Sequence, residues 1–287
     1  MESPTFDYYR KESHFETTSY SQFNVFDCLQ DKFDGNDKKW IDIEIELRDF
    51  AKNIDLTKCD KKQDAIGYIE KTFNQVREAL CEYLEKIDYS SIDIQSVAIM
   101  ALKAISGGRN CVIYNFNYTD LSRLYAYVGR TPLFTVHNIH GTLKEKSIVL
   151  GFENTPLKYP NLDFMIKYQS DSYNPPDDIR RDLEEAEEVL FFGHTLGSTD
   201  HSYFQRFFQR EVDVLRTKQI PICIVTFDAK SRRLINREIN NMTNDEADVL
   251  NINYIQTHGN MSQEDTCNFF KKLAKRTTPN IEISALR

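Results

Sequence analysis

The sequence lacks the features of a secreted or membrane-spanning protein. No apolar run approaches the ~20 residues that cross a bilayer, and residues 1–10 contain no apolar signal-peptide core. The cysteines form no Cys-x-x-Cys pair; they are Cys28, Cys59, Cys81, Cys111, Cys223 and Cys267. We therefore expect free thiols and a soluble, cytoplasmic protein that does not contact membranes.

The chain also lacks an excess of positive charge. The 36 Lys and Arg residues face 44 Asp and Glu, a formal net charge of −8. General nucleic-acid binding needs a basic surface, so we do not expect it here. Carboxylates that a nuclease could use are supplied by two groups, Asp42, Glu44 and Glu46 in the first and Asp171, Asp177 and Asp178 in the second. Such clusters are typical of solvated faces, and no paired lysine motif accompanies them, so a nuclease is the weakest hypothesis.

The sequence contains no internal repeat, no low-complexity tract and no linker rich in proline or glycine. We therefore expect a single α/β domain over residues 1–287. Apolar spacing predicts helices over 40–54, 66–84 and 94–105. The first of these also alternates like a strand, but Glu44, Glu46 and Arg48 favour a helix. This helical front third, residues 40–106, is interpreted as an insertion or cap within the domain.

Strands and helices alternate after residue 106. Apolar runs predict strands over 111–117, 133–139, 147–152, 189–192, 220–227 and 252–256. Helices are predicted over 121–128, 178–188, 203–215, 229–242 and 263–275, and a long loop over the proline-containing residues 153–178. This alternation indicates an α/β fold, Rossmann-like, with a parallel sheet flanked by helices. The aromatic stripe of Tyr203, Phe204, Phe207 and Phe208 is predicted to be core.

Polar residues follow three of the predicted strands. Asn117 ends the strand predicted over 111–117, and Asp120 follows it. His140 and Gly141 follow the strand predicted over 133–139, and residues 193–200 follow the strand predicted over 189–192. Ligands of open parallel sheets bind at the carboxyl ends of the strands. The three segments therefore predict one site along a common edge.

Each residue of the first two segments has a functional and a structural interpretation. The amide of Asn117 can orient a sugar hydroxyl or a water, whereas Asn117 and Asp120 can also cap the next helix. His140 can act as a general base near neutral pH, or be a structural histidine, and Gly141 permits close approach of a ligand. His137 and His140 point to opposite faces of a strand, so no metal site is expected.

The third segment is a short turn with glycines four residues apart. It contributes Gly193, His194, Thr195, Ser198 and Asp200. Its backbone N–H groups and the next helix N-terminus can face a phosphate. The structural alternative is a tight turn with Ser198 or Asp200 as N-cap. The segment is neither a Gly-x-Gly-x-x-Gly motif nor a P-loop.

Taken in order, these segments resemble the AbiH family of bacterial phage abortive-infection proteins. The resemblance rests on Asn-Phe-Asn-Tyr-Thr-Asp at 115–120, Ile-His-Gly at 139–141 and Gly-His-Thr-Leu-Gly-Ser-Thr-Asp at 193–200, followed by Tyr203 and Phe204. Trp-Ile-Asp-Ile-Glu at 40–44 is similar to a further family segment. The family in turn resembles sirtuin-type NAD-binding domains.

The resemblance implies a defence effector that hydrolyses NAD or a related nucleotide. Asn117 and His140 would be catalytic, acting on an oxocarbenium-like state, with no metal. The nucleotide would be bound by Asp120, Gly141, Gly193, His194, Thr195, Ser198 and Asp200. The alternative is a non-enzymatic defence or interaction protein. Homo-oligomer formation, the phage component and a toxin or antitoxin partner stay open.

One family feature has no counterpart in the sequence. The family usually opens with a strand and a Gly-Asn-Gly-Phe-Asp turn, where a sirtuin-like fold holds phosphates. Here only Gly35 precedes Gly67, and Thr18, Ser19 and Tyr20 resemble the residues that come after that turn. We expect either that the gene model starts late or that the first strand is lost. In an acidic chain, an anionic ligand then depends on local backbone N–H groups.

Overall fold

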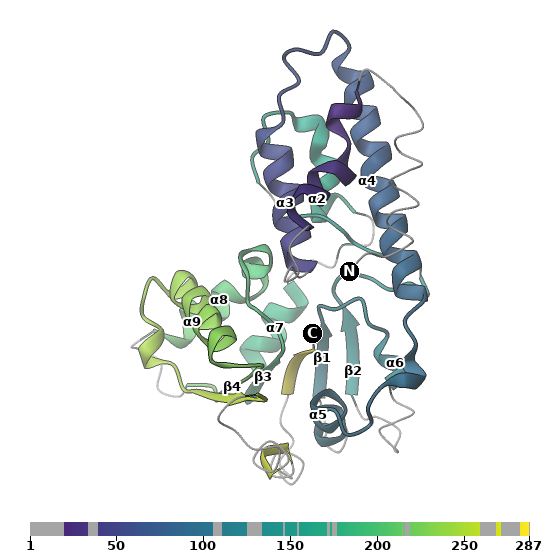
Figure 1. The fold of residues 1–287 in the computed structure, drawn as a ribbon. Helices are drawn as coiled ribbons and strands as arrows, with labels where there is room; N and C mark the ends of the chain where they lie inside the picture. The colour runs from purple at the N-terminus through teal and green to yellow at the C-terminus, as the bar shows by residue number, and fades with distance from the viewer. Residues whose placement is uncertain are drawn as a thin grey trace. The chain divides into compact units, whose positions relative to one another are not determined.

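In the computed structural model the chain folds into two compact units. The structure describes residues 20–33, 40–105, 111–124, 134–145, 147–153, 155–170, 173, 177–213, 215, 219–258, 268–270 and 282–286. The first unit comprises Met1–Ile87 and His140–Asn174, and the second Asp88–Ile139 and Pro175–Arg287 (Figure 1). The single domain with an insertion over 40–106 stays a prediction.

The first unit is helical. Its helices are α2 (Val25–Phe33), α3 (Trp40–Asn53) and α4 (Lys62–Glu85), with the 3-10 helices η1 (Ser21–Phe23), η4 (Pro160–Met165) and η5 (Lys167–Gln169). Helix α2 packs on α3 and α4, and Phe26, Leu47 and Ile69 are fully buried. The two helices predicted over 40–54 and 66–84 are confirmed, whereas α2 lies in a stretch whose apolar periodicity is weak.

The second unit contains a parallel sheet. Its strands are β1 (Cys111–Asn115), β2 (Phe134–Asn138), β3 (Glu188–Phe192), β4 (Ile222–Thr226), β5 (Ile252–Gln256) and β6 (Glu282–Leu286). Every pair is parallel, in the order β2-β1-β6-β3-β4-β5. Its helices are α5 (Val97–Ile105), α6 (Leu121–Leu124), α7 (Asp177–Glu185), α8 (His201–Glu211) and α9 (Ala229–Thr243), with η2 (Tyr89–Ser91), η6 (Ser198–Asp200) and η7 (Ala247–Val249). The predicted α/β class is confirmed.

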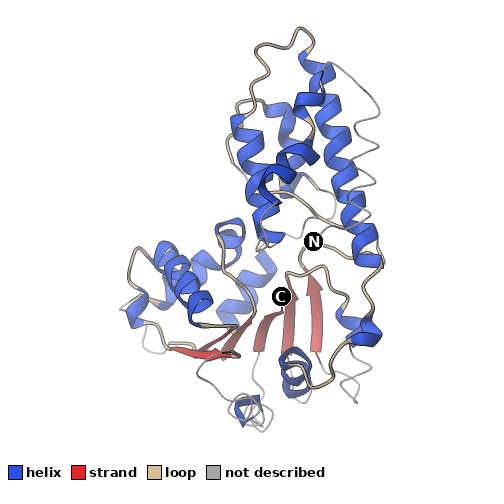
Figure 2. Cartoon of the chain, in the orientation of Figure 1, coloured by secondary structure: helices blue, strands red, loops and turns tan. Residues whose placement is uncertain are grey.

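Helices cover both faces of the sheet (Figure 2). Alternate strand residues point to opposite faces. Val189 and Phe191 of β3 join the cluster formed with α7, α8 and α9, whereas Leu190 and Phe192 join the cluster formed with α5 and α6. Such strands are apolar throughout because both faces are buried. The stripe of Tyr203, Phe204, Phe207 and Phe208 is buried core, as predicted.

The strand order reverses direction at β6. From β1 the chain moves outward to β2, and from β3 it moves outward the other way to β4 and β5. Strand β6, the last in the chain, lies between β1 and β3 and pairs with both. In open α/β sheets, ligands bind outside the carboxyl ends of the strands at such a switch point. The loops that follow β1 and β3 therefore border the position where a ligand is expected.

Several predicted boundaries differ from the structure. Residues 147–152 do not form a strand of the sheet; their only ladder contact among the described residues is an isolated bridge between Phe152 and Ile166. The expected loop over 153–178 contains η4 and η5. Of the helix predicted over 263–275, only residues 268–270 are described, and they are helical. Strand β6 has no counterpart among the predictions.

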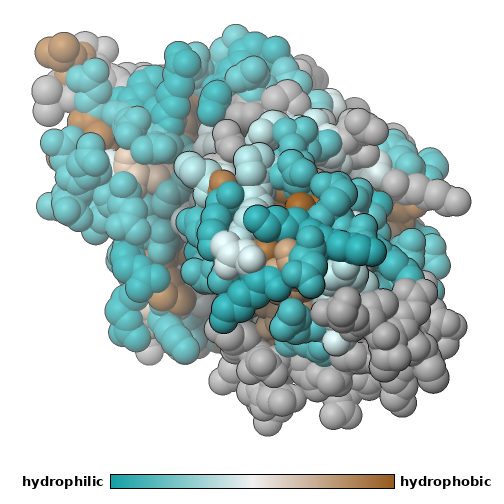
Figure 3. Space-filling model, turned by 90° about the horizontal axis from the view of Figure 1, so that it is seen from above, coloured by the Kyte–Doolittle hydropathy of each residue, from teal (hydrophilic) through white to brown (hydrophobic). Residues whose placement is uncertain are grey.

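Polar residues predominate on the face of the molecule that Figure 3 shows, with small, separate hydrophobic patches. Among the residues placed by the structure, no helix combines the length and apolarity needed to cross a membrane. Five of the six cysteines lie in the described ranges, and none of these five is in a disulfide bond, as expected: Cys28, Cys59, Cys81, Cys111 and Cys223.

Candidate functional site

The loop after β1 is organised by a buried asparagine. The side-chain nitrogen of Asn115 donates to the carbonyl of Thr119 and to Oδ1 of Asn138, both at 2.9 Å. Its Oδ1 accepts from the backbone N–H of Asn117 at 3.0 Å. These bonds close the loop on itself and join the carboxyl ends of β1 and β2. Asn115 therefore has a structural role that the sequence analysis did not identify.

Asn117 and Asp120 differ in how their side chains are used. Oδ1 of Asp120 accepts from the backbone N–H of Ser122 at 2.9 Å, so Asp120 caps α6, the structural alternative named above. The half-buried amide of Asn117 makes no side-chain hydrogen bond with any residue that the structure describes. Asn117 thus presents donors and an acceptor at the carboxyl edge of the sheet.

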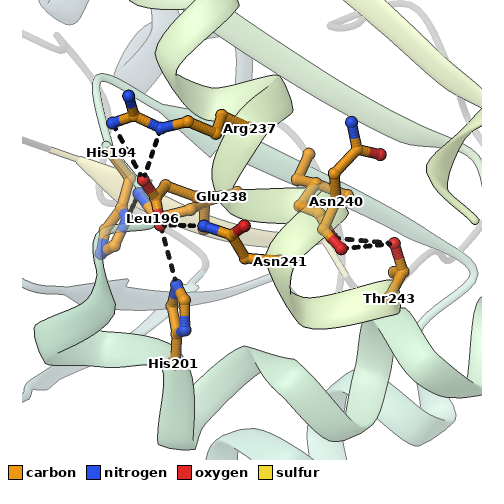
Figure 4. Close-up of polar contacts among 9 residues, drawn as sticks. His194, Leu196, His201, Arg237, Glu238, Asn240, Asn241 and Thr243 are labelled. Carbon is orange, nitrogen blue, oxygen red and sulfur yellow. Dashed lines mark hydrogen bonds and ion pairs between the residues drawn. The ribbon is translucent and has the colours of Figure 1, made fainter. Parts of the chain in front are cut away.

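The loop after β3 is built around a buried histidine (Figure 4). The backbone N–H of Leu196 donates to Nδ1 of His194 at 2.8 Å, and Leu196 adopts the left-handed conformation with φ 52°. Because Nδ1 accepts, the ring proton is on Nε2, which lies 3.5 Å from Oδ2 of Asp200. Both side chains are fully buried. They hold the turn together and are not exposed to a ligand.

The other predicted residues of this loop are more accessible. Gly193 is exposed at φ 63°, and its N–H donates to the carbonyl of Val225 at 3.1 Å. Thr195 is half-buried, and Ser198 is exposed at the start of η6. Asp200 precedes α8 without a side-chain capping bond. Gly193, Thr195 and Ser198 are therefore the members of this segment that a ligand can reach.

The loops after β1 and β3 are in contact, although β6 lies between these two strands in the sheet. The ring of Phe116, next to Asn117, packs edge-on against His194 with centroids 4.7 Å apart. It also meets Tyr203 and Phe204 of α8 at 5.1 and 5.3 Å. This aromatic cluster fixes the β1 loop against the β3 loop.

His140 belongs to the first unit and lies in a buried polar cluster. Its Nε2 lies 3.4 Å from Nζ of Lys167, which donates to Oε2 of Glu44 at 3.0 Å. Exposed fractions are 3% for His140, 2% for Lys167 and 5% for Glu44. The expectation that Glu44 belongs to a solvated face is therefore wrong, because a buried ammonium pairs with it. No sequence motif identifies Lys167 as a functional residue.

Gly141 has a structural reason to be glycine. Its φ is +73°, and a Cβ at this position would lie 1.8 Å from the carbonyl oxygen of Ser147. The group that closely approaches Gly141 is therefore the backbone of Ser147, not a ligand. The carbonyl of His140 accepts from the N–H of Val149 at 3.0 Å, which fixes the same turn.

A second histidine of the α8 region forms a polar cluster with α9 (Figure 4). Nε2 of His201 lies 3.3 Å from Oε2 of Glu238, which also accepts from the amide of Asn241 at 3.3 Å. Arg237 contacts the other carboxylate oxygen at 3.4 Å. None of these residues belongs to a motif recognised in the sequence. Their contacts connect the first turn of α8 to α9.

The predicted catalytic pair is divided between the two units, with Asn117 in the second and His140 in the first. His137, the other histidine considered near β2, stacks on Tyr114 with centroids 5.0 Å apart. Within the described ranges, no three His, Cys, Asp or Glu side chains gather as they would around a metal ion.

One comparison with known proteins gives a match. The family model described as "Bacteriophage abortive infection AbiH" matches residues 4–220, more than half of the 287 residues. No curated protein and no solved structure gives a significant match. The matched range includes all three strand-end segments and the segment with Glu44. The chain therefore belongs to the AbiH family of bacteriophage abortive infection proteins.

Proposed function

We propose that this abortive infection protein acts by hydrolysing the nicotinamide–ribose bond of NAD or a closely related nucleotide. The observation that carries the proposal is the amide of Asn117. This side chain lies half-buried at the carboxyl edge of a parallel sheet, beside the switch point, and makes no hydrogen bond with the described residues. Doubly wound sheets bind nucleotides at this edge, where polar groups can contact the ligand.

The reaction needs few protein groups. The bond between C1′ of the ribose and the nicotinamide nitrogen breaks, and its electron pair neutralises the positively charged ring. Water attacks the oxocarbenium-like carbon, and its proton passes to a base. In the assignment that the family resemblance implies, Asn117 orients the ribose or the water, and His140 accepts the proton.

The geometry supports a smaller nucleotide-binding set than the resemblance implies. His194, Asp200 and Asp120 already have partners within the fold. Gly193, Thr195 and Ser198 are accessible, so we propose that they face the nucleotide, with Gly193 and Thr195 on the adenosine side. Gly141 acts by allowing the turn that holds His140.

The test is nicotinamide release by the purified full chain. We expect free nicotinamide and ADP-ribose from NAD, and a loss of about a hundredfold in rate for Asn117→Ala, because the ribose or the water is no longer oriented. The matched control is Asn253→Ala, an asparagine exposed on β5, which should keep the wild-type rate. Equal rates in folded Asn117→Ala and wild type would contradict the proposal.

A second candidate is a protein that binds its partner without catalysis. The loop after β3 favours this candidate. The backbone N–H groups of Gly193, Leu196 and Asp200 all donate hydrogen bonds within the protein, so they are not available to a phosphate. Calorimetric titration with NAD and with ADP-ribose separates the two. Saturable binding of either nucleotide would argue against this candidate.

A further inference from the structure

We infer that Lys167 and Glu44 are positioning residues that hold His140 as the neutral tautomer protonated on Nδ1, with Nε2 as acceptor. The inference rests on the proposed role of His140 as the base. The proposed reaction does not otherwise use the buried charges of Lys167 and Glu44.

The contacts determine which atom donates. A lysine ammonium has three N–H donors and no acceptor. Nζ of Lys167 lies 3.4 Å from Nε2 of His140, so Nε2 must accept. A neutral imidazole with an accepting Nε2 carries its proton on Nδ1. Lys167 therefore selects one of the two neutral forms of the ring.

Glu44 keeps the donor in place. It accepts from Nζ of Lys167 at 3.0 Å, and both side chains are almost completely buried. A buried ammonium without a counter-ion would lose its proton or leave the site. Glu44 comes from α3, Lys167 from η5 and His140 from the turn after β2, so three distant segments meet at one ion pair.

The two distances also suit a base. The bond of Lys167 to Glu44 has an ordinary length of 3.0 Å, whereas its contact with His140 is longer, at 3.4 Å, and more easily replaced. A water molecule can take the place of the Lys167 N–H at Nε2 while Lys167 stays on Glu44. The lone pair is thus oriented before substrate arrives, which lowers the cost of reaching the reactive geometry.

The experiment measures the tautomer of His140 directly. The full chain is labelled with nitrogen-15 in its six histidine rings, and the His140 signals are assigned with His140→Gln. We expect a protonated Nδ1 and an unprotonated Nε2. His194 is the internal reference, since its Nδ1 accepts from Leu196 and it should show the opposite tautomer.

The variant replaces both charges together. Glu44→Met with Lys167→Met leaves no unpaired buried charge and a similar side-chain volume, so the chain should fold. We expect the Nε2-protonated form of His140 to appear, with the His194 signals unchanged. Nicotinamide release should fall about tenfold or more in kcat, with KM changed less than about threefold.

Two outcomes would overturn the assignment: wild-type His140 protonated on Nε2, or a tautomer that the double variant leaves unchanged. The spectra do not depend on turnover. The expected spectra without nicotinamide release would uphold the positioning of His140 and reject the proposed function. If the wild type releases nicotinamide but the double variant leaves the His140 spectra unchanged, the proposed function is upheld and the positioning of His140 is rejected.

Discussion

Lys167 and Glu44 form an ion pair at 3.0 Å although 123 residues separate them in the chain. The pair joins α3 to η5 inside the first unit, where neither charge is solvated. Attraction between buried charges offsets their desolvation only while both are present.

Removing one member should therefore cost more than removing both. We expect Lys167→Met alone to lower the free energy of unfolding by about 3–5 kcal/mol. The double variant with Glu44→Met should recover most of that loss. Urea denaturation of the folded proteins measures both values.

The exposed pair of Lys158 and Asp55 is the control. Its atoms lie 3.2 Å apart, but both side chains are about half exposed, at 51% and 49%. Lys158→Met should change stability little, because solvent screens such pairs. An equal effect of Lys158→Met and Lys167→Met would contradict the role of burial.

Two glycines should respond oppositely to alanine. Gly141→Ala places a Cβ 1.8 Å from the carbonyl oxygen of Ser147 at a φ of +73°, so the turn must distort and the protein lose stability. Gly67 lies within α4, and a Cβ there meets nothing within 4 Å. Gly67→Ala should raise the unfolding free energy by about 0.5–1 kcal/mol.

Thermal unfolding of the two alanine variants tests this contrast. A Gly141→Ala protein as stable as wild type would show that the turn after β2 relaxes easily. The constraint on His140 would then be weaker than the geometry indicates.

The sequence predicted those parts of the fold that depend on local periodicity. Helix α4 and strands β3 and β4 have uninterrupted apolar patterns, and each appears within a few residues of its predicted position. Residues 147–152 show the limit of predicting strands from apolar runs. The run is apolar, but it forms a strand only if the tertiary fold places a partner strand beside it. Strand β6 is the opposite case: the sheet gives it two neighbours, while its own residues are not a continuous apolar run.

The candidate site was predictable only in part, for a similar reason. Asn117 and the glycine turn after β3 follow from the rule that ligands bind at the carboxyl ends of strands. Glu44 and Lys167 lie in segments 123 residues apart, and single-sequence patterns carry no information about such pairs. The burial of His194 also depends on contacts with Phe116 and Phe204 that the sequence does not specify.

Tyr114 should make the protein sensitive to alkali. Its hydroxyl donates to Oδ2 of Asp182 at 2.7 Å, and burial, with this bond, raises the pKa of the Tyr114 phenol. Below about pH 10 the phenol is neutral in both folded and unfolded states. Above that value the unfolded chain releases the proton and the folded protein retains it, so stability falls as pH rises.

Tyr114→Phe should remove this contribution. Urea unfolding between pH 8 and pH 11 is expected to show a smaller decline for the variant than for wild type. The exposed Tyr168→Phe serves as a control and should follow the wild-type curve. Identical declines in Tyr114→Phe and wild type would show that another group dominates the alkaline response.

The most direct test of the proposed function is the NAD content of bacteria that express the chain. Wild type should deplete cellular NAD and arrest growth, because release of nicotinamide is the proposed toxic reaction. Asn117→Ala, expressed at the same level and folded, should leave both NAD and growth intact, whereas the control Asn253→Ala should behave as wild type. Growth arrest with unchanged NAD in wild type, or full NAD depletion by Asn117→Ala, would contradict the account.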